Sequence, residues 1–256
     1  MIAPVTQQGL VVVSIENHAI GSSLAGQQRV VLRTNAFLSE RSIPVTWFSR
    51  YRSFEDIQVI SDTLVDHHEA AILTDNNWCS NQISRKAFSE ELSRRCERLN
   101  AVGVRVSTVA IDNGLPADSL DILVKQRISL VRDLNDSTSS AVRGLQPYSD
   151  ESKRYGIWKL PAPYTLTELT QRNVRTVVAR RQMVKQLHRG NCVHVNMRLS
   201  QLMDAAGWKR AIQLIDQLSQ MRDRGRIQIS PVNSLCYVAR RVVQNSQSHS
   251  DIRPAA

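Results

Sequence analysis

Short apolar runs alternate with helix-like segments along the chain, and this alternation constrains the fold more than any other sequence feature. Residues 10–14, LVVVS, form a compact β-branched run that is typical of a strand buried on both faces. No hairpin signal joins one run to the next, so the sequence predicts an α/β fold with a parallel sheet. The expected strands are residues 10–14, 43–48, 69–73, 104–110, 128–131, 157–160 and 192–197.

Helical periodicity fills the spaces between these runs. In the clearest example Phe88, Leu92 and Leu99 recur on one face, with Ser84 as a suitable cap and Gly103 as a stop. Further helices are expected at residues 30–38, 53–64, 116–125 and 209–223, with a last one beginning at 230–231. Residues 133–154 are polar and aperiodic, and we expect a long loop over one rim of the sheet. Periodicity alone does not distinguish an open, doubly wound sheet from a barrel.

The length of 256 residues and the hydrophobic content of 42% fit one domain with a substantial core. We place that domain at residues 9–244, with flexible termini at 1–8 and 245–256. The N-terminus lacks the features of a signal peptide, and no apolar run reaches the ~20 residues of a membrane span, which predicts a cytoplasmic protein. The widely spaced cysteines are expected to be reduced thiols, which argues against a cysteine zinc site. They are Cys79, Cys96, Cys192 and Cys236.

A formal net charge of +10 favours association with anions, but aromatic residues make up only 5% of the chain. No zinc-finger spacing or RNA-binding strand motif sharpens a nucleic-acid interpretation. Part of the charge lies in one basic stretch, which we expect to be a solvated helical face and which also offers a surface for an anionic polymer. Its cations are Arg172, Arg175, Arg180, Arg181, Lys185 and Arg189.

Four segments, taken in order, resemble the polysaccharide deacetylase family of the NodB-homology type. They are residues 37–48 (FLSERSIPVTWF), 68–78 (HEAAILTDNNW), 155–161 (YGIWKLP) and 192–197 followed by 221–235 (MRDRGRIQISPVNSL). The resemblance spans roughly residues 9–244. It implies a single distorted (β/α) barrel with seven or eight parallel strands, which periodicity does not establish.

The family's reaction needs a divalent metal held by one Asp and two His, a carboxylate base, and a His that protonates the leaving amine. The first family motif falls on residues 14–17, which places Glu16 at the base and Asn17 at the metal ligand. In a second register Ser14 stands at the base position and Glu16 near the metal. Only one carboxylate survives in either register, so Glu16 is the sole candidate base.

The two metal-binding histidines of the family fall on Leu73 and Asn77. Leucine has no lone pair and asparagine is a weak ligand, so the resemblance implies that Asn17, Leu73 and Asn77 hold no metal. The final catalytic histidine falls on Met197 or Arg198, while His194 lies further back in the strand. A displaced metal site built from Glu16, Asp75 and His18 stays open.

We therefore expect a non-catalytic pseudoenzyme that binds a carbohydrate or a protein partner. One alternative is an active metal-dependent carbohydrate deacetylase with a rebuilt site, and a second is a basic surface binder of nucleic acid or another anionic polymer. No serine-hydrolase or nucleotide-binding motif is present. For several of the polar cleft candidates, capping of strand ends is an equally open role, and for the tryptophans core packing is the more expected one. The cleft candidates are Glu16, Asn17, Asp75, Asn77, Trp78, Arg132, Trp158 and His194.

Overall fold

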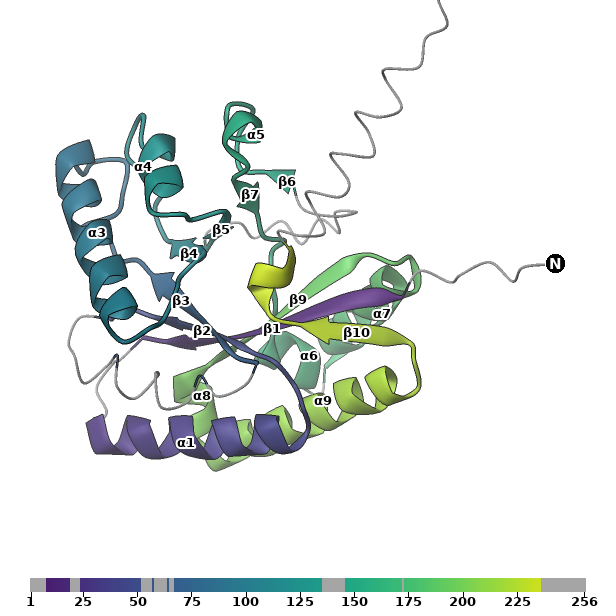
Figure 1. The fold of residues 1–256 in the computed structure, drawn as a ribbon. Helices are drawn as coiled ribbons and strands as arrows, with labels where there is room; N and C mark the ends of the chain where they lie inside the picture. The colour runs from purple at the N-terminus through teal and green to yellow at the C-terminus, as the bar shows by residue number, and fades with distance from the viewer. Residues whose placement is uncertain are drawn as a thin grey trace, which may run out of the picture.

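The computed structural model describes residues 8–18, 24–51, 57, 64, 67–134, 146–171 and 173–235. Its described strands form one sheet in the order β6-β7-β5-β4-β3-β2-β1-β9-β8, and β10 pairs with β1 (Figure 1). The strands are β1 (Gly9–Asn17), β2 (Thr46–Ser49), β3 (Glu69–Leu73), β4 (Thr108–Ile111), β5 (Leu130–Asp133), β6 (Gln146–Pro147), β7 (Trp158–Lys159), β8 (Tyr164–Thr165), β9 (Cys192–Arg198) and β10 (Ile227–Ser230).

The sheet is a curled half-barrel dominated by parallel pairs, so the predicted distorted (β/α) barrel class is confirmed. Among the described residues the only antiparallel pair is β6 with β7, and the edges at β6 and β8 are not joined to each other. The half-barrel is therefore open in this part of the chain. All seven predicted strands are present, and β6, β8 and β10 were not predicted.

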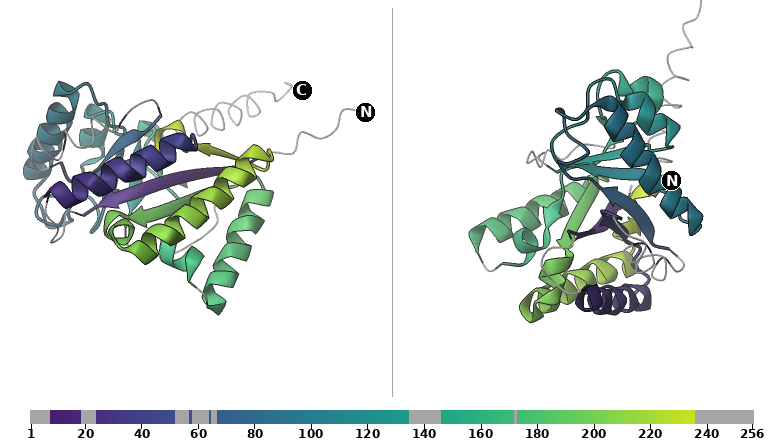
Figure 2. Two further views of the ribbon diagram at one scale, coloured as in Figure 1. Left: turned by 90° about the horizontal axis from the view of Figure 1, so that it is seen from below. Right: turned by 90° about the vertical axis from the view of Figure 1, so that its left-hand side faces the viewer.

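The longer helices cover the outer side of the sheet, whereas the short 3-10 helix η1 (Val232–Ser234) packs on the inner side. The α-helices are α1 (Leu24–Glu40), α3 (Arg85–Ala101), α4 (Leu120–Lys125), α5 (Ser152–Tyr155), α6 (Leu166–Thr170), α7 (Val174–His188), α8 (Leu199–Met203) and α9 (Ala205–Asp223). The predicted ends of α3 are confirmed, because Ser84 accepts a hydrogen bond from the Ala87 amide and Gly103 has φ +80°. Figure 2 shows α1 and α9 side by side, where the rings of Phe37 and Trp208 meet edge to face at 5.4 Å.

One expectation for the loops was wrong. The segment 133–154 is not a plain loop, because it contains β6 and the start of α5, while residues 135–145 lie outside the described part. The last helix, expected to begin at residues 230–231, is present with a slightly later start: β10 ends at Ser230, Pro231 is the N-cap, and η1 begins at Val232. The helix expected at 53–64 lies almost entirely outside the described residues.

Strand alternation gives the sheet two different cores. On β1, Val11, Val13 and Ile15 belong to the large outer core beneath the helices, whereas Val12 belongs to a smaller inner core. The 3-10 helix η1 contributes Val232 to the same inner core. The inner core consists of Val12, Phe48, Ala71, Leu73, Ala110, Leu130, Leu160, Val232 and Leu235. Along β1, Ser14 and Glu16 continue the alternation that begins at Val12, and this places the candidate site on the inner face.

The basic stretch and the cysteines agree with expectation. The described cations of the basic stretch, all on or just after α7, are exposed, and Arg172 lies outside the described residues. The three cysteines that the structure describes, Cys79, Cys96 and Cys192, are free thiols. Within the described ranges, no helix combines the length and apolarity needed to cross a bilayer.

Candidate functional site

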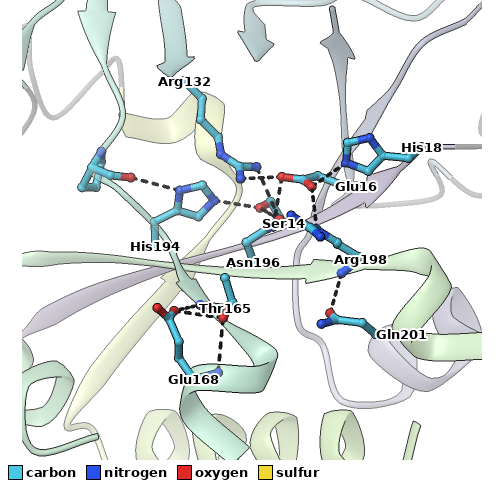
Figure 3. Close-up of polar contacts among 11 residues, drawn as sticks. Ser14, Glu16, His18, Arg132, Thr165, Glu168, His194, Asn196, Arg198 and Gln201 are labelled. Atoms are coloured by element: carbon cyan, nitrogen blue, oxygen red, sulfur yellow. Dashed lines mark hydrogen bonds and ion pairs between the residues drawn. The ribbon is translucent and has the colours of Figure 1, made fainter. Parts of the chain in front are cut away.

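A polar cluster lies on the inner face of the sheet, toward the C-terminal ends of its central strands (Figure 3). β1 supplies Ser14 and Glu16, and β9 runs beside it with Asn196 level with Ser14 and Arg198 level with Glu16. Alternate residues of a strand share one face, so His194, Asn196 and Arg198 point to the same side. Arg132 reaches the cluster from β5. These six residues, together with His18, are called the inner cluster below.

Glu16 is the centre of the inner cluster. Its carboxylate forms an ion pair with Arg132 and accepts hydrogen bonds from Asn196 Nδ2 at 3.0 Å and from His18 Nε2 at 2.8 Å. The Nε atom of Arg198 lies 3.7 Å away. Burial alone would raise the pKa of Glu16, but the His18 hydrogen bond and the charge of Arg132 outweigh it and lower the pKa from 4.5 to about 2. Glu16 is therefore ionised at neutral pH, with a donor at each oxygen.

Arg132 is the buried cation of the cluster, with 4% of its side chain exposed. Burial lowers the pKa of Arg132 and the charge of Glu16 raises it, and a guanidinium stays protonated in proteins. Its carbon Cζ lies 5.4 Å from the centre of the Phe48 ring, and Nη1 is 3.4 Å from Asn196 Oδ1. Removal of Glu16 would leave this buried charge without its counter-ion.

His194 and Ser14 form a short hydrogen bond behind Glu16, with 2.7 Å between Nε2 and Oγ. His194 Nδ1 lies 3.2 Å from the carbonyl of Pro161, which can only accept, so Nδ1 carries the proton of the neutral ring. Burial, followed by the charge of Arg132, lowers the pKa of His194 to about 3 and keeps the ring neutral. The single proton of Ser14 is then shared between His194 Nε2 and Asn196 Oδ1, which lies 2.9 Å away.

A serine beside a histidine base is the arrangement of a covalent nucleophile. Ser14 and His194 both have 0% exposure, however, and a nucleophile must touch its substrate. The pair instead orients Asn196. Because the Ser14 hydroxyl donates to the amide oxygen of Asn196, the amide nitrogen of Asn196 is directed at Glu16, to which it donates. We interpret the pair as the support of the Glu16 cage, the name used below for the Glu16 carboxylate with the side chains of Arg132, Asn196, His18 and Arg198 around it.

The other predicted site residues have different surroundings. Leu73 has 0% exposure and packs in the inner core, and Asn17 is 7% exposed at the end of β1. Asn77 is exposed in the turn after β3, where its backbone amide donates to Asp75 Oδ1 at 3.1 Å. Asp75 faces Arg50 at 3.9 Å. Asp75 and Asn77 are thus joined to each other in the turn that follows β3.

The two tryptophans differ in their surroundings. Trp78 belongs to the outer core, where its ring stacks on Phe88 of α3 at 5.9 Å and carries Arg95 at 4.7 Å on its face. Its ring is thus committed to packing. Trp158 is partly buried against the inner core, on the same side of the sheet as the cage.

The residues at the family's metal positions do not fit a divalent metal. The side chain of Leu73 fills the inner core and has no donor atom, and Asn17 and Asn77 offer only neutral amides. Glu16 and His18 do come together, but their contact is a hydrogen bond within the cage. In the residues that the structure describes, no three His, Cys, Asp or Glu side chains gather into a metal-binding group, Asp75 included.

Sequence reasoning identified Glu16, Arg132 and His194 but did not assign a role to Asn196 or Arg198 as donors to Glu16. The signal was present in β9, where His194, Asn196 and Arg198 alternate with Val195 and Met197. Polar residues at every second position of an otherwise apolar strand indicate a polar face.

Comparisons with known proteins agree with this geometry at the level of the fold. No protein-family model and no curated protein matches the sequence. A candidate polysaccharide deacetylase from Mycobacterium smegmatis is similar over 93% of this chain and 92% of its own, with 12% identity and a TM-score of 0.68. A peptidoglycan N-acetylglucosamine deacetylase is similar over 90% of this chain and 89% of its own, with 9% identity and a TM-score of 0.51. The chain has the fold of polysaccharide deacetylases.

Proposed function

We propose that this protein is a non-catalytic member of the polysaccharide deacetylase family, and that its inner cluster binds a carbohydrate without a metal. The observation that carries the proposal is the state of Glu16. The one carboxylate at the family's acid positions is held by Arg132, Asn196 and His18, with Arg198 beside it. It acts as the anchor of a rigid cage.

Such a carboxylate is poorly suited to general-base catalysis. A base works best when its pKa lies near the operating pH, and the pKa of Glu16 is about 2. An attacking water would also have to compete with neighbouring donors, because both Glu16 oxygens already accept hydrogen bonds. The family's final catalytic histidine falls on Met197 or Arg198, and His194, further back in β9, is fully buried and stays neutral.

The outer members of the inner cluster suit a polar, uncharged ligand. The side chain of Arg198 is 62% exposed and that of His18 is 27% exposed, so both combine a contact to Glu16 with access to solvent. Guanidinium and imidazole N–H groups donate to sugar hydroxyls and to the carbonyl of an acetamide group. The fold likeness to an N-acetylglucosamine deacetylase supports oligomers of that sugar as the first ligand to test.

Calorimetric titration with N-acetylglucosamine oligomers tests the binding role directly. The wild-type protein should bind with one saturable site, and Arg198→Gln should weaken binding by about tenfold, the effect of one lost charged hydrogen bond. The matched control is Arg181→Gln, an exposed arginine on α7 that does not belong to the inner cluster. No heat of binding in the wild type, or an equal loss in both variants, would contradict carbohydrate binding at this cluster and would leave the protein-partner alternative.

A further inference from the structure

A second polar pocket lies at the opposite ends of the strands from the inner cluster. It has a volume of about 710 Å³ and opens before β4 and β5, between the C-terminal ends of α3 and α4 and the 3-10 helix η1. Its lining residues are Cys96, Asn100, Arg105, Val106, Ser107, Lys125, Gln126, Arg127, Ser129 and Asn233. We propose that this pocket binds a small phosphorylated ligand through Arg105, Lys125 and Arg127.

Charge is the first argument. The three ionisable side chains other than Cys96 are all cations, and no Asp or Glu lines the pocket. Arg105, Lys125 and Arg127 are exposed, and no ion pair joins any of them to an acid among the described residues. Three cations around one concave surface repel one another, and an anion between them removes that repulsion.

Helix capping does not explain the three cations. The last carbonyl groups of α3 accept from the backbone amides of Val102, Gly103 and Val104, and those of α4 accept from Gln126, Arg127 and Ile128. A helix C-terminus carries about half a negative charge, so two of them offset about one of the three positive charges. A surplus of roughly two positive charges therefore faces the pocket.

The buried carboxyl nearest the floor does not serve as the missing partner. Ser107 and the Asn233 amide both donate to Glu69, at 3.3 and 2.8 Å, and Thr46 and Thr108 complete its hydrogen bonds at 2.8 Å each. Glu69 is 5% exposed, and its oxygens are turned to these donors. The interaction fixes the floor of the pocket and leaves the cations at its rim free for a ligand.

The chemistry of the lining favours a phosphate group on a polar carrier. Guanidinium groups match the oxygens of a phosphate in pairs, and a lysine adds a compact charge. Asn100 and Ser129 add neutral hydrogen-bonding groups that suit the hydroxyls of the carrier. The volume lies within the range of about 300–1,000 Å³ that is usual for small-molecule sites.

The test uses inorganic pyrophosphate as the probe, in isothermal titration with the full chain at about 0.15 M salt, where nonspecific surface attraction is screened. The triple variant Arg105→Gln, Lys125→Gln and Arg127→Asn should lose at least about tenfold in affinity, because one charged hydrogen bond is already worth that much. Asn is chosen at residue 127 because its φ is +61° and asparagine tolerates that conformation. Melting curves without ligand check that the variant folds.

The matched control removes the same three charges elsewhere, in Arg175→Gln, Arg181→Gln and Lys185→Gln on α7, and should bind pyrophosphate as the wild type does. Saturable binding that is lost only in the pocket variant supports the site. An equal loss in the control, or no saturable binding by the wild type, would overturn it. Binding of citrate as tight as that of pyrophosphate would overturn the assignment to phosphate. Because no pocket residue belongs to the inner cluster, this result is independent of the proposed carbohydrate function.

Discussion

Replacement of Glu16 by Gln keeps the shape of the side chain and removes the charge that holds the inner cluster together. The pKa of Glu16 is lowered from 4.5 to about 2, a difference that corresponds to about 3.4 kcal/mol at about 1.36 kcal/mol for each pH unit. Because the folded-state pKa is depressed, this stabilisation is complete above about pH 4.5 and is lost as the pH falls through 2. The variant also leaves Arg132 buried without a counter-ion, so we expect a loss of about 3–5 kcal/mol at pH 7.

Urea unfolding followed by tryptophan fluorescence measures this loss at pH 7 and at pH 3. At pH 3 the wild type has given up about 2 of the 3.4 kcal/mol, so the difference between wild type and Glu16→Gln should shrink by about that amount. The control Glu90→Gln removes an exposed acid paired with Lys86 at 3.9 Å and should change stability by less than about 1 kcal/mol. A loss below about 1 kcal/mol in Glu16→Gln at pH 7, or a difference independent of pH, would refute the cage.

Three further predictions concern His194, Glu69 and the family's metal positions. The ring of His194, with its pKa lowered to about 3, should stay neutral to pH 4 in an NMR titration, and a transition above pH 5 would contradict its buried hydrogen bonding. Glu69→Gln should destabilise the protein by about 1–3 kcal/mol in urea unfolding, because the amide nitrogen cannot accept from the surrounding donors; an unchanged midpoint would show that those bonds contribute nothing. The combination Asn17→Asp, Leu73→His and Asn77→His should create saturable zinc binding by calorimetry, and its absence in a folded variant would show that these residues do not occupy the family's metal positions.

The sequence predicted the fold best where a strand is rich in apolar residues. The prediction for residues 69–73 matches β3 at both ends, and β1 lies where expected, because strands buried on both faces read as apolar segments. β9 also lies where expected, although its apolar residues alternate with polar ones. The strands β6 and β8 have two residues each and are too short to show a period. In β10 the alternation Ile227-Gln-Ile229 is present in the sequence but short, and its pairing with β1 depends on tertiary contacts.

The candidate site was predictable in part for a similar reason. The resemblance to deacetylases located Glu16 and Arg132, and it showed that leucine stands at a metal position. The cage itself depends on partners far apart in the sequence, since Asn196 and Glu16 are 180 residues apart and meet only because β1 pairs with β9. Strand order, which local patterns do not encode, decides which polar faces meet.

Acetate release tests the central claim most directly. Purified protein is incubated with N-acetylglucosamine oligomers, with and without added zinc or cobalt, and acetate is measured against a protein-free blank. With Glu16 ionised within the cage and Leu73 at a metal position, acetate should not rise above the blank under any of these conditions. Metal-dependent acetate release by the wild type that disappears in Glu16→Gln would contradict the claim and identify an active deacetylase.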